Sequence, residues 1–344
     1  MLFNKKTFSP KNLKNRFLIN YSFLKKELVS RGLPTEITIE LTNICNLHCI
    51  MCPHDKMKRK QGFMDFNLFK KIIDQVKSHV EIVDLDLFGE SLMNPEAFKM
   101  IKYCKSKGLK TLVNSNMTHM NEEKCKKLIN SGLDMLTISF DGATKETYEK
   151  VRKGANYEQT LQNIKTFLKL KGQGKPHTRI QMIYMTHTES EAKKFLEIWK
   201  KTNADLVRIK PFINLDREKK FYAIEHLKQK QNERPCIYLW RNLSVYWNGD
   251  VVPCCDDYDS MYVVGNVNKK PIKEIWNDKP LVELRRKHIQ GKQNLVRLCK
   301  ECRYFEPSNL FVIGSIFIDA FTARQILPFF EKMIILKNKK FLKY

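Results

Sequence analysis

Three cysteines that lie close together in this chain are the residues best suited to metal chemistry. Cys45, Cys49 and Cys52 lie on a polar loop directly after a short apolar segment. Three thiolates on one tight loop can bind three irons of a 4Fe–4S cluster and leave the fourth iron open. An open position on a metal is where a substrate or cosubstrate can bind. The competing interpretation is a zinc site completed by His48 or His54, although a three-then-two spacing is unusual for zinc.

A second group of cysteines lies in the last third of the chain. It consists of Cys236, Cys254, Cys255, Cys299 and Cys302. Four of these thiolates could converge on one zinc ion, because the Cys299-x-x-Cys302 spacing is typical of structural zinc sites. The remaining two cysteines, Cys104 and Cys125, fall in predicted helices. We expect both to be buried there as small hydrophobic residues.

The composition limits the kind of protein in which these cysteines act. The 344 residues suffice for a barrel-sized catalytic domain and a smaller one. The net charge of +25 fits nucleic acid, an anionic membrane or an acidic substrate as a partner, or simply a lysine-rich surface. The N-terminal residues lack the pattern of a signal peptide, so we expect a cytoplasmic protein whose cysteines serve metal or redox chemistry.

Alternating strands and helices must position these groups. The predicted strands cover 37–41, 82–88, 110–114, 134–140, 178–185 and 206–211. The predicted helices cover 65–79, 95–107, 121–131, 157–171 and 190–201. A strand followed by a helix, repeated about six times, is typical of a parallel α/β sheet or barrel. We therefore predict an α/β fold with a partial (β/α)6 barrel of parallel strands, followed by a small C-terminal cysteine-rich α+β domain.

The texture of the sequence divides the chain into five segments. They are a basic N-terminal extension (1–35), a core (36–215), a linker (216–235), a cysteine-rich domain (236–304) and an apolar and basic tail (305–344). Helical pieces are expected around 20–29, a hairpin over 243–254 that turns at Gly249, and short helices near 272–276 and 281–288. The apolar run 310–318 could lie on an anionic membrane, but we favour packing against the barrel or a dimer contact.

The first cysteine loop resembles a known family. Its sequence, ELTNICNLHCIMCP, is similar to the defining motif of radical S-adenosylmethionine (SAM) enzymes, and residues 35–215 follow the order of elements in that family. Phe88-Gly89-Glu90 resembles the family's Gly-Glu element, whose backbone and carboxylate bind the SAM amino group. Phe88 replaces the usual glycine and Ser91 the usual proline, and neither change removes the glutamate.

The resemblance also implies which residues bind SAM. They are Met51, Gly89, Glu90, Asn114, Asn116, Ser139, Asp141 and Arg152. In the family, the position of Met51 contacts the adenine, and Ser139, Asp141 and Arg152 occupy the ribose- and carboxylate-binding positions. A forked guanidinium such as that of Arg152 is suited to a carboxylate; the alternative interpretation is one more basic side chain on a basic protein.

The second cysteine group resembles the SPASM/twitch region found at the C-terminus of some radical SAM enzymes. The stretches that carry this resemblance are NGDVVPCCDD, VGNVNKKPIKEIWN and CKEC. It implies one auxiliary 4Fe–4S cluster bound by Cys236, Cys254, Cys299 and Cys302, with Cys255 as the alternative to Cys254.

The family's chemistry implies a reaction. A flavodoxin or ferredoxin would supply an electron, SAM would yield a 5′-deoxyadenosyl radical, and an auxiliary cluster suggests oxidation of the substrate radical. Oxidation of an alcohol also needs a base, for which Asp256, Asp257 and Tyr258 are candidates. We expect a small polar or glycan-like substrate, and the lysine-rich surface would also fit an anionic one.

Two other functions compete with this hypothesis. A peptide-modifying enzyme is possible, although only about forty residues precede Cys45, which is short for a peptide-recognition domain. An iron–sulfur electron carrier or a zinc-stabilised nucleic-acid binder is the non-enzymatic alternative. Neither would explain Glu90, and the chain carries no recognisable nucleic-acid-binding module, so we expect no nucleic-acid partner.

Overall fold

Most of the strands in the described part of the chain form one mixed sheet. The computed structural model describes residues 9–212, 234–300, 302 and 308–318. In this part of the chain, nine strands are joined in the order β11-β10-β9-β1-β3-β4-β5-β7-β8. The parallel strands of the core are β1 (Glu36–Ile39), β3 (Ile82–Asp84), β4 (Lys110–Ser115), β5 (Met135–Ser139), β7 (His177–Tyr184) and β8 (Leu206–Pro211). Each of them overlaps a strand predicted from the sequence.

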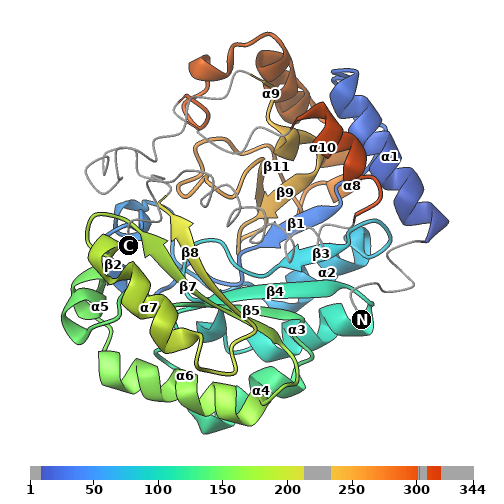
Figure 1. Ribbon diagram of the computed structural model, residues 1–344. Coiled ribbons are helices and arrows are strands. Elements are labelled where there is room, and N and C mark those ends of the chain that lie inside the picture. The colour runs from blue at the N-terminus through green and yellow to red at the C-terminus, as the bar shows by residue number, and fades with distance from the viewer. Residues whose placement is uncertain (1–8, 213–233, 301, 303–307, 319–344) are drawn as a thin grey trace.

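Amphipathic helices connect these strands and cover the outer side of the sheet (Figure 1). They are α2 (Phe66–Val76), α3 (Ala97–Ser106), α4 (Glu122–Asn130), α5 (Lys145–Val151), α6 (Tyr157–Lys171) and α7 (Ala192–Trp199). In α2, the Asp65 carboxylate accepts hydrogen bonds from the first backbone amides, and a face that includes Phe69 and Ile73 is buried. The short α5 was not predicted; Thr144 caps it, and only Tyr148 and Val151 are buried along it, too few for a visible period.

The predicted partial barrel is confirmed. In the described residues the curved sheet does not close on itself, because β1 pairs with β9 on the side away from β3. The alternate side chains of each core strand pack against the helices in one large apolar core, which includes Ile37, Val83, Val113, Ile138 and Ile180. The carboxyl ends of the parallel strands therefore lie along one edge, where α/β folds bind their ligands.

The C-terminal region continues this sheet. The strands β9 (Asn242–Val245) and β10 (Asp250–Val252) form the predicted hairpin, with Gly249 at a φ of 90° in its turn. The short β11 (Gly265–Asn266) pairs with β10. The helices α8 (Ile272–Ile275) and α9 (Lys279–Ile289) agree with the two short helices predicted.

The N-terminal segment packs on the C-terminal region. Its helix α1 runs over Pro10–Leu24, earlier than the predicted 20–29. Ser9 and Pro10 begin it, and Lys26, at a φ of 55°, ends it. The fully buried Arg285 of α9 then donates to the carbonyls of Leu28, Leu239 and Trp276, at 3.0, 2.9 and 3.0 Å. One buried guanidinium thus links the N-terminal segment to the C-terminal region.

The remaining segments bear less on the site. A last helix, α10 (Asn309–Gly314), lies beside α1 in Figure 1 and begins the predicted apolar run. The predicted linker 216–235 lies outside the described residues apart from 234–235, as does the tail beyond 318. Within the described residues, no helix has the length and apolar character required to cross a membrane.

Candidate active site

The first cysteine loop is held closed by its own backbone. Cys49 belongs to the short strand β2 (His48–Cys49), which pairs with β6 (Arg152–Lys153). The Cys52 amide donates to the Cys49 carbonyl at 3.0 Å, which closes a tight turn. Cys45, Cys49 and Cys52 are each partly buried. Met51 packs on Val151 and Met185 beneath the loop.

A cation lies against this loop. The Nη1 atom of Arg152 is 3.8 Å from Cys49 Sγ, and its Nη2 atom is 2.6 Å from Asp141 Oδ2. The other oxygen of Asp141 accepts from the Ile183 amide at 2.6 Å. Burial raises the pKa of Cys49, and the charge of Arg152 acts in the opposite direction. The structure therefore brings Asp141 and Arg152 together with Cys49, as an ion pair that faces a thiol.

The predicted Gly-Glu element touches the start of the same loop. Gly89 has a φ of 104°, and a Cβ there would lie 2.5 Å from the Thr42 carbonyl oxygen, so this close approach requires glycine. The Glu90 amide donates to the Ile44 carbonyl at 2.9 Å. The residue that precedes the glutamate is thus positioned by the cysteine loop itself.

Glu90 is a buried carboxylate with two hydrogen-bond donors. Its oxygens accept from the Ser115 hydroxyl at 2.8 Å and from the Asn116 amide at 2.7 Å. Its side chain is nearly inaccessible, and this burial raises the pKa of Glu90 while the two donors lower it. A ligand cation such as an ammonium would stabilise the ionised form further.

The other predicted SAM-binding residues lie at the carboxyl ends of β4 and β5. Asn116 donates to Asn46 Oδ1 at 3.1 Å, which connects the end of β4 to the cysteine loop. Asn114 is exposed, and its amide donates to Asp86 at 3.0 Å. Ser139 is the last residue of β5 and is partly buried. Asn46, which we did not predict, is an ordinary polar residue in the sequence and gave no signal of this role.

The second group of cysteines comes from three separate segments. Cys236 precedes a short helix, Cys254 follows β10, and Cys299 and Cys302 lie in one turn, closed by a 3.1 Å hydrogen bond from the Cys302 amide to the Cys299 carbonyl. All four line one cavity, and Cys255 does not line it. Burial raises the pKa of Cys236, and the pKa of Cys254 is raised by the neighbouring Cys255 thiol and by burial.

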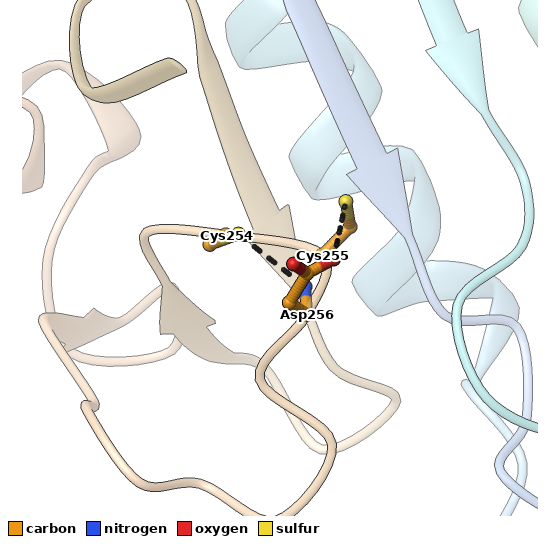
Figure 2. Close-up of side chains that lie close together, drawn as sticks. All are labelled: Cys254, Cys255 and Asp256. Atoms are coloured by element: carbon orange, nitrogen blue, oxygen red, sulfur yellow. Dashed lines mark hydrogen bonds between the residues drawn. The ribbon is translucent and has the colours of Figure 1, made fainter. Parts of the chain in front are cut away.

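A smaller group of potential ligands lies at the edge of this cavity. The ligand atoms of Cys254, Cys255 and Asp256 lie within 4.8 Å of one another (Figure 2). Of these three residues, Cys254 and Asp256 line the cavity.

The three candidate bases have different surroundings. Both oxygens of the fully buried Asp257 accept hydrogen bonds from backbone amides, one from Met261 at 2.8 Å and one from Tyr262 at 2.9 Å. Asp257 thus organises its own loop. Asp256 lines the cysteine cavity, and its amide lies 3.4 Å from Cys254 Sγ, as Figure 2 shows.

Tyr258 connects the second site to the first. The centroid of its ring lies 6.0 Å from that of Phe88, and the two rings meet edge to face. Phe88 is the residue directly before Gly89. The Tyr258 carbonyl accepts from Arg59 Nε at 2.8 Å. Arg59 itself follows the first cysteine loop and forms a bidentate pair with the fully buried Glu40, at 2.9 and 2.6 Å. This pair was not predicted, because Arg59 lies outside the cysteine motif whose first residue is Glu40.

A buried histidine that we did not predict also belongs to the second site. His288 of α9 lies 3.3 Å from Cys299 Sγ through Nε2, and its Nδ1 atom accepts from the Cys236 amide at 3.3 Å. Burial lowers the pKa of His288 to about 4, so the ring is neutral at ordinary pH. Helical spacing places His288 on the face of α9 that carries Leu281 and Leu284, a pattern typical of an ordinary core residue.

Known proteins that resemble this chain agree with the geometry. Residues 39–198 match the family described as the radical SAM superfamily, and residues 236–303 match the SPASM family, an iron–sulfur cluster-binding domain. The chain is 22% identical to a tungsten-containing aldehyde ferredoxin oxidoreductase cofactor-modifying protein of Pyrococcus furiosus, over 77% of this chain and 86% of that protein. It is also 22% identical to the S-adenosyl-L-methionine-dependent 2-deoxy-scyllo-inosamine dehydrogenase of Niallia circulans, over 77% of this chain and 91% of that enzyme.

Solved structures share the fold. The crystal structure of BtrN in complex with AdoMet and 2-DOIA superposes with a TM-score of 0.55 at 17% identity, covering 81% of this chain and 98% of that one. Streptococcus suis SuiB bound to S-adenosylmethionine gives a TM-score of 0.62 at 16% identity, covering 81% and 74%. The two domains imply two 4Fe–4S clusters and SAM as cofactors. This chain is an enzyme of the radical SAM superfamily that carries a SPASM-type auxiliary iron–sulfur domain.

Proposed function

We propose that this enzyme cleaves SAM at the first cysteine loop and uses the 5′-deoxyadenosyl radical to oxidise an alcohol carbon of a small polar or glycan-like substrate. The observation that carries this proposal is the direct connection between the two sites. The Tyr258 ring packs on Phe88 beside Glu90, and the Tyr258 carbonyl accepts from Arg59. The loop that follows Cys254 therefore borders the SAM-binding element.

The donor set of the first loop fits a cluster with one open iron. Bound by the thiolates of Cys45, Cys49 and Cys52, a 4Fe–4S cluster together with SAM supplies the adenosyl radical once an external flavodoxin- or ferredoxin-type protein has delivered an electron. Burial raises the pKa of Cys45 to about 11, so binding of iron must displace the thiol proton. Arg152 offsets part of this cost at Cys49.

The residues around the loop would hold SAM. Glu90, buried and already accepting two hydrogen bonds, would bind the ammonium group of SAM, and Met51 would contact the adenine. Ser139, Asn114 and Asn116 lie at the strand ends that border this position. We assign Asp141 and Arg152 a joint role, because each is the other's partner and Arg152 also reaches Cys49.

The second site would complete the oxidation. Held by Cys236, Cys254, Cys299 and Cys302, an auxiliary 4Fe–4S cluster supplies a one-electron acceptor with no open iron. With these groups bound, the substrate carbon would give a hydrogen atom to the adenosyl radical. The substrate would then lose one electron to this acceptor and its hydroxyl proton to a base, which would leave a carbonyl. We propose Asp256 or Tyr258 as the base, because both lie on the loop between the sites. Asp257 is left out because its oxygens are occupied.

The relative from Niallia circulans supports this reaction class, since it is named as a SAM-dependent dehydrogenase and nearly its whole length is matched. The first test is cleavage of SAM by anaerobically reconstituted enzyme. Reduced protein with full iron should release 5′-deoxyadenosine and methionine. Full iron content with no release of either product would contradict the proposal.

The second test separates oxidation from SAM cleavage. With 2-deoxy-scyllo-inosamine as the probe substrate, Asp256→Asn or Tyr258→Phe should lower ketone formation by about 10²-fold while uncoupled SAM cleavage persists, because general base catalysis is worth roughly that factor. Tyr262→Phe is the matched control, since the Tyr262 hydroxyl makes one long hydrogen bond, 3.4 Å, to the Pro280 carbonyl. If neither substitution changes ketone formation, the base lies elsewhere.

A further inference from the structure

His288 occupies an unusual position in the second site. It lies in the last turn of α9, its side chain is 4% exposed, and it lines the same cavity as the four cysteines. One ring nitrogen faces Cys299 Sγ at 3.3 Å, and the other faces the Cys236 amide at 3.3 Å. A single imidazole therefore contacts two of the four cysteines, which come from segments far apart in the sequence.

The backbone decides which ring nitrogen carries the hydrogen. A backbone amide can only donate, so Nδ1 of His288 must accept from the Cys236 amide. A neutral imidazole has one donor and one acceptor, and the hydrogen is then on Nε2. The Nε2–H group points to Cys299 Sγ, and the sulfur is the acceptor.

We propose that His288 is a positioning residue of the auxiliary cluster, which donates a hydrogen bond to the Cys299 thiolate and so makes the cluster easier to reduce. This inference rests on the proposed role of that cluster as an electron acceptor. Adding an electron increases the negative charge on the thiolate sulfurs, and a hydrogen-bond donor stabilises the more negative state. The hydrogen bond thereby favours transfer of an electron from the substrate radical to the cluster.

The expected size follows from the strength of such a bond. A hydrogen bond to a charged acceptor in a buried site changes an equilibrium by about tenfold or more. For a one-electron couple, a tenfold change corresponds to ~59 mV. Loss of the donor should therefore move the midpoint potential of the auxiliary cluster by about that amount in the negative direction.

Two substitutions separate the donor from the ring. The side-chain amide of His288→Gln can reach the place of Nε2 and still donate to Cys299, whereas the shorter His288→Asn replaces only the Nδ1 side, next to the Cys236 amide. Both would be made in the full-length Cys45→Ala/Cys49→Ala/Cys52→Ala protein, which lacks the cysteines of the first site and retains those of the auxiliary site. The midpoint potential is then measured by titration followed with electron paramagnetic resonance, with iron content as the control for cluster loading.

The expected result is a potential about 59 mV more negative in His288→Asn, with His288→Gln close to the parent protein. A fully loaded His288→Asn protein with an unchanged potential would overturn the proposal, as would an equal loss in His288→Gln. A purely structural role would change cluster content or stability and leave the potential of the loaded cluster unaltered.

A measurement on the unsubstituted protein decides the case where the variants fail to load. In protein labelled with 15N-histidine, electron–nuclear double resonance of the reduced auxiliary cluster should detect a weak nitrogen coupling and an exchangeable proton. Absence of both, or a strong coupling typical of a direct histidine ligand, would refute the hydrogen bond. These readouts need no substrate, so they stand even if the enzyme does not act as a dehydrogenase.

Discussion

The two cysteine sites of this enzyme are built in different ways. In the first, a single loop carries Cys45, Cys49 and Cys52, and local backbone contacts close it, among them the 3.0 Å hydrogen bond from the Cys52 amide to the Cys49 carbonyl. In the second, the hairpin, the segment before it and the turn after α9 must meet before their thiols line one cavity. The cysteines of the first site therefore come from one short stretch of chain, which the pairing of β2 with β6 holds in place, whereas those of the second meet only in the folded domain.

The sites also differ in charge. Arg152, a permanent cation, lies 3.8 Å from Cys49 Sγ and is itself paired with Asp141. The neighbour of Cys299 is a neutral imidazole, which offers a hydrogen bond without a formal charge. A cation stabilises a thiolate strongly, whereas a neutral donor does so modestly and locally. This difference agrees with the proposal that the hydrogen bond from His288 adjusts the potential of the second site in a small step.

Between them stands a buried ion pair. Arg59 reaches Glu40 under the first loop, the ring of Tyr246 at 3.8 Å and the Tyr258 carbonyl at 2.8 Å. Asp259 adds a second link, because its carboxylate accepts from the Lys58 amide at 2.6 Å. The two sites are therefore connected through Arg59 and Asp259, which lie outside both cysteine motifs.

The largest effect should come from breaking the first site alone. Cys49→Ala removes one ligand of the predicted SAM-binding cluster, so SAM cleavage should fall by at least about 10³-fold, since the cofactor performs the hard step. Iron content should fall from about eight to about four atoms per chain, because the second site is intact. Chromatographic assay of 5′-deoxyadenosine and colorimetric iron analysis check both values.

Cys125→Ala is the control for that experiment, because Cys125 is a buried cysteine in α4, away from both sites. The Cys125→Ala protein should have the iron content and the rate of SAM cleavage of the wild type. If Cys49→Ala still cleaved SAM at the wild-type rate, the assignment of the first loop would be wrong.

The next largest effect should come from breaking the buried ion pair between Arg59 and Glu40. Arg59→Leu leaves Glu40 as an uncompensated buried carboxylate, and breaking a buried pair from one side costs about 3–5 kcal/mol. The free energy of unfolding, measured by denaturant titration of the loaded protein, should fall by that amount. The double variant Glu40→Leu/Arg59→Leu removes the isolated charge and should recover a large part of the loss. A double variant as unstable as the single one would mean that Arg59 acts through its other contacts.

A smaller effect sharpens the description of the first site. Glu90→Gln keeps the shape of the buried side chain and removes its charge, so SAM should bind about 2 kcal/mol more weakly, roughly 30-fold. Isothermal titration calorimetry on the oxidised, reconstituted protein measures this directly. Glu96→Gln is the matched control, because the Glu96 carboxylate pairs with Lys99 at the surface and its substitution should not change SAM affinity. Equal affinity of Glu90→Gln and wild type would exclude Glu90 from SAM binding.

The smallest effect concerns the adjacent cysteines of the second site. Cys255 does not line the cavity, so Cys255→Ala should leave the iron content and the spectrum of the auxiliary cluster unchanged, whereas Cys254→Ala should lose that cluster. Iron analysis in the Cys49→Ala background gives the clearest contrast. Loss of iron from Cys255→Ala with retention in Cys254→Ala would exchange the two assignments.

The fold was predictable where the sequence has a strong period. Strands such as 178–185 and helices such as 157–171 were predicted close to their observed bounds, because apolar residues repeat clearly along them. The start of α1 at Pro10 and the whole of α5 were missed. Capping residues set both elements, and caps are weak signals when few apolar side chains follow them.

The sequence by itself determined the class of enzyme and predicted the residues of the first site, because the spacing of Cys45, Cys49 and Cys52 and the Gly89-Glu90 pair are local features that folding preserves. Only the tertiary structure decided that Asp257 serves its own loop, that Cys254 lines the cavity rather than Cys255, and that Arg59 and His288 belong to the site. The physical reason is distance along the chain. Hydrogen bonds and ion pairs between remote segments have no recognisable residue spacing in the sequence. They form only once the sheet has brought those segments together.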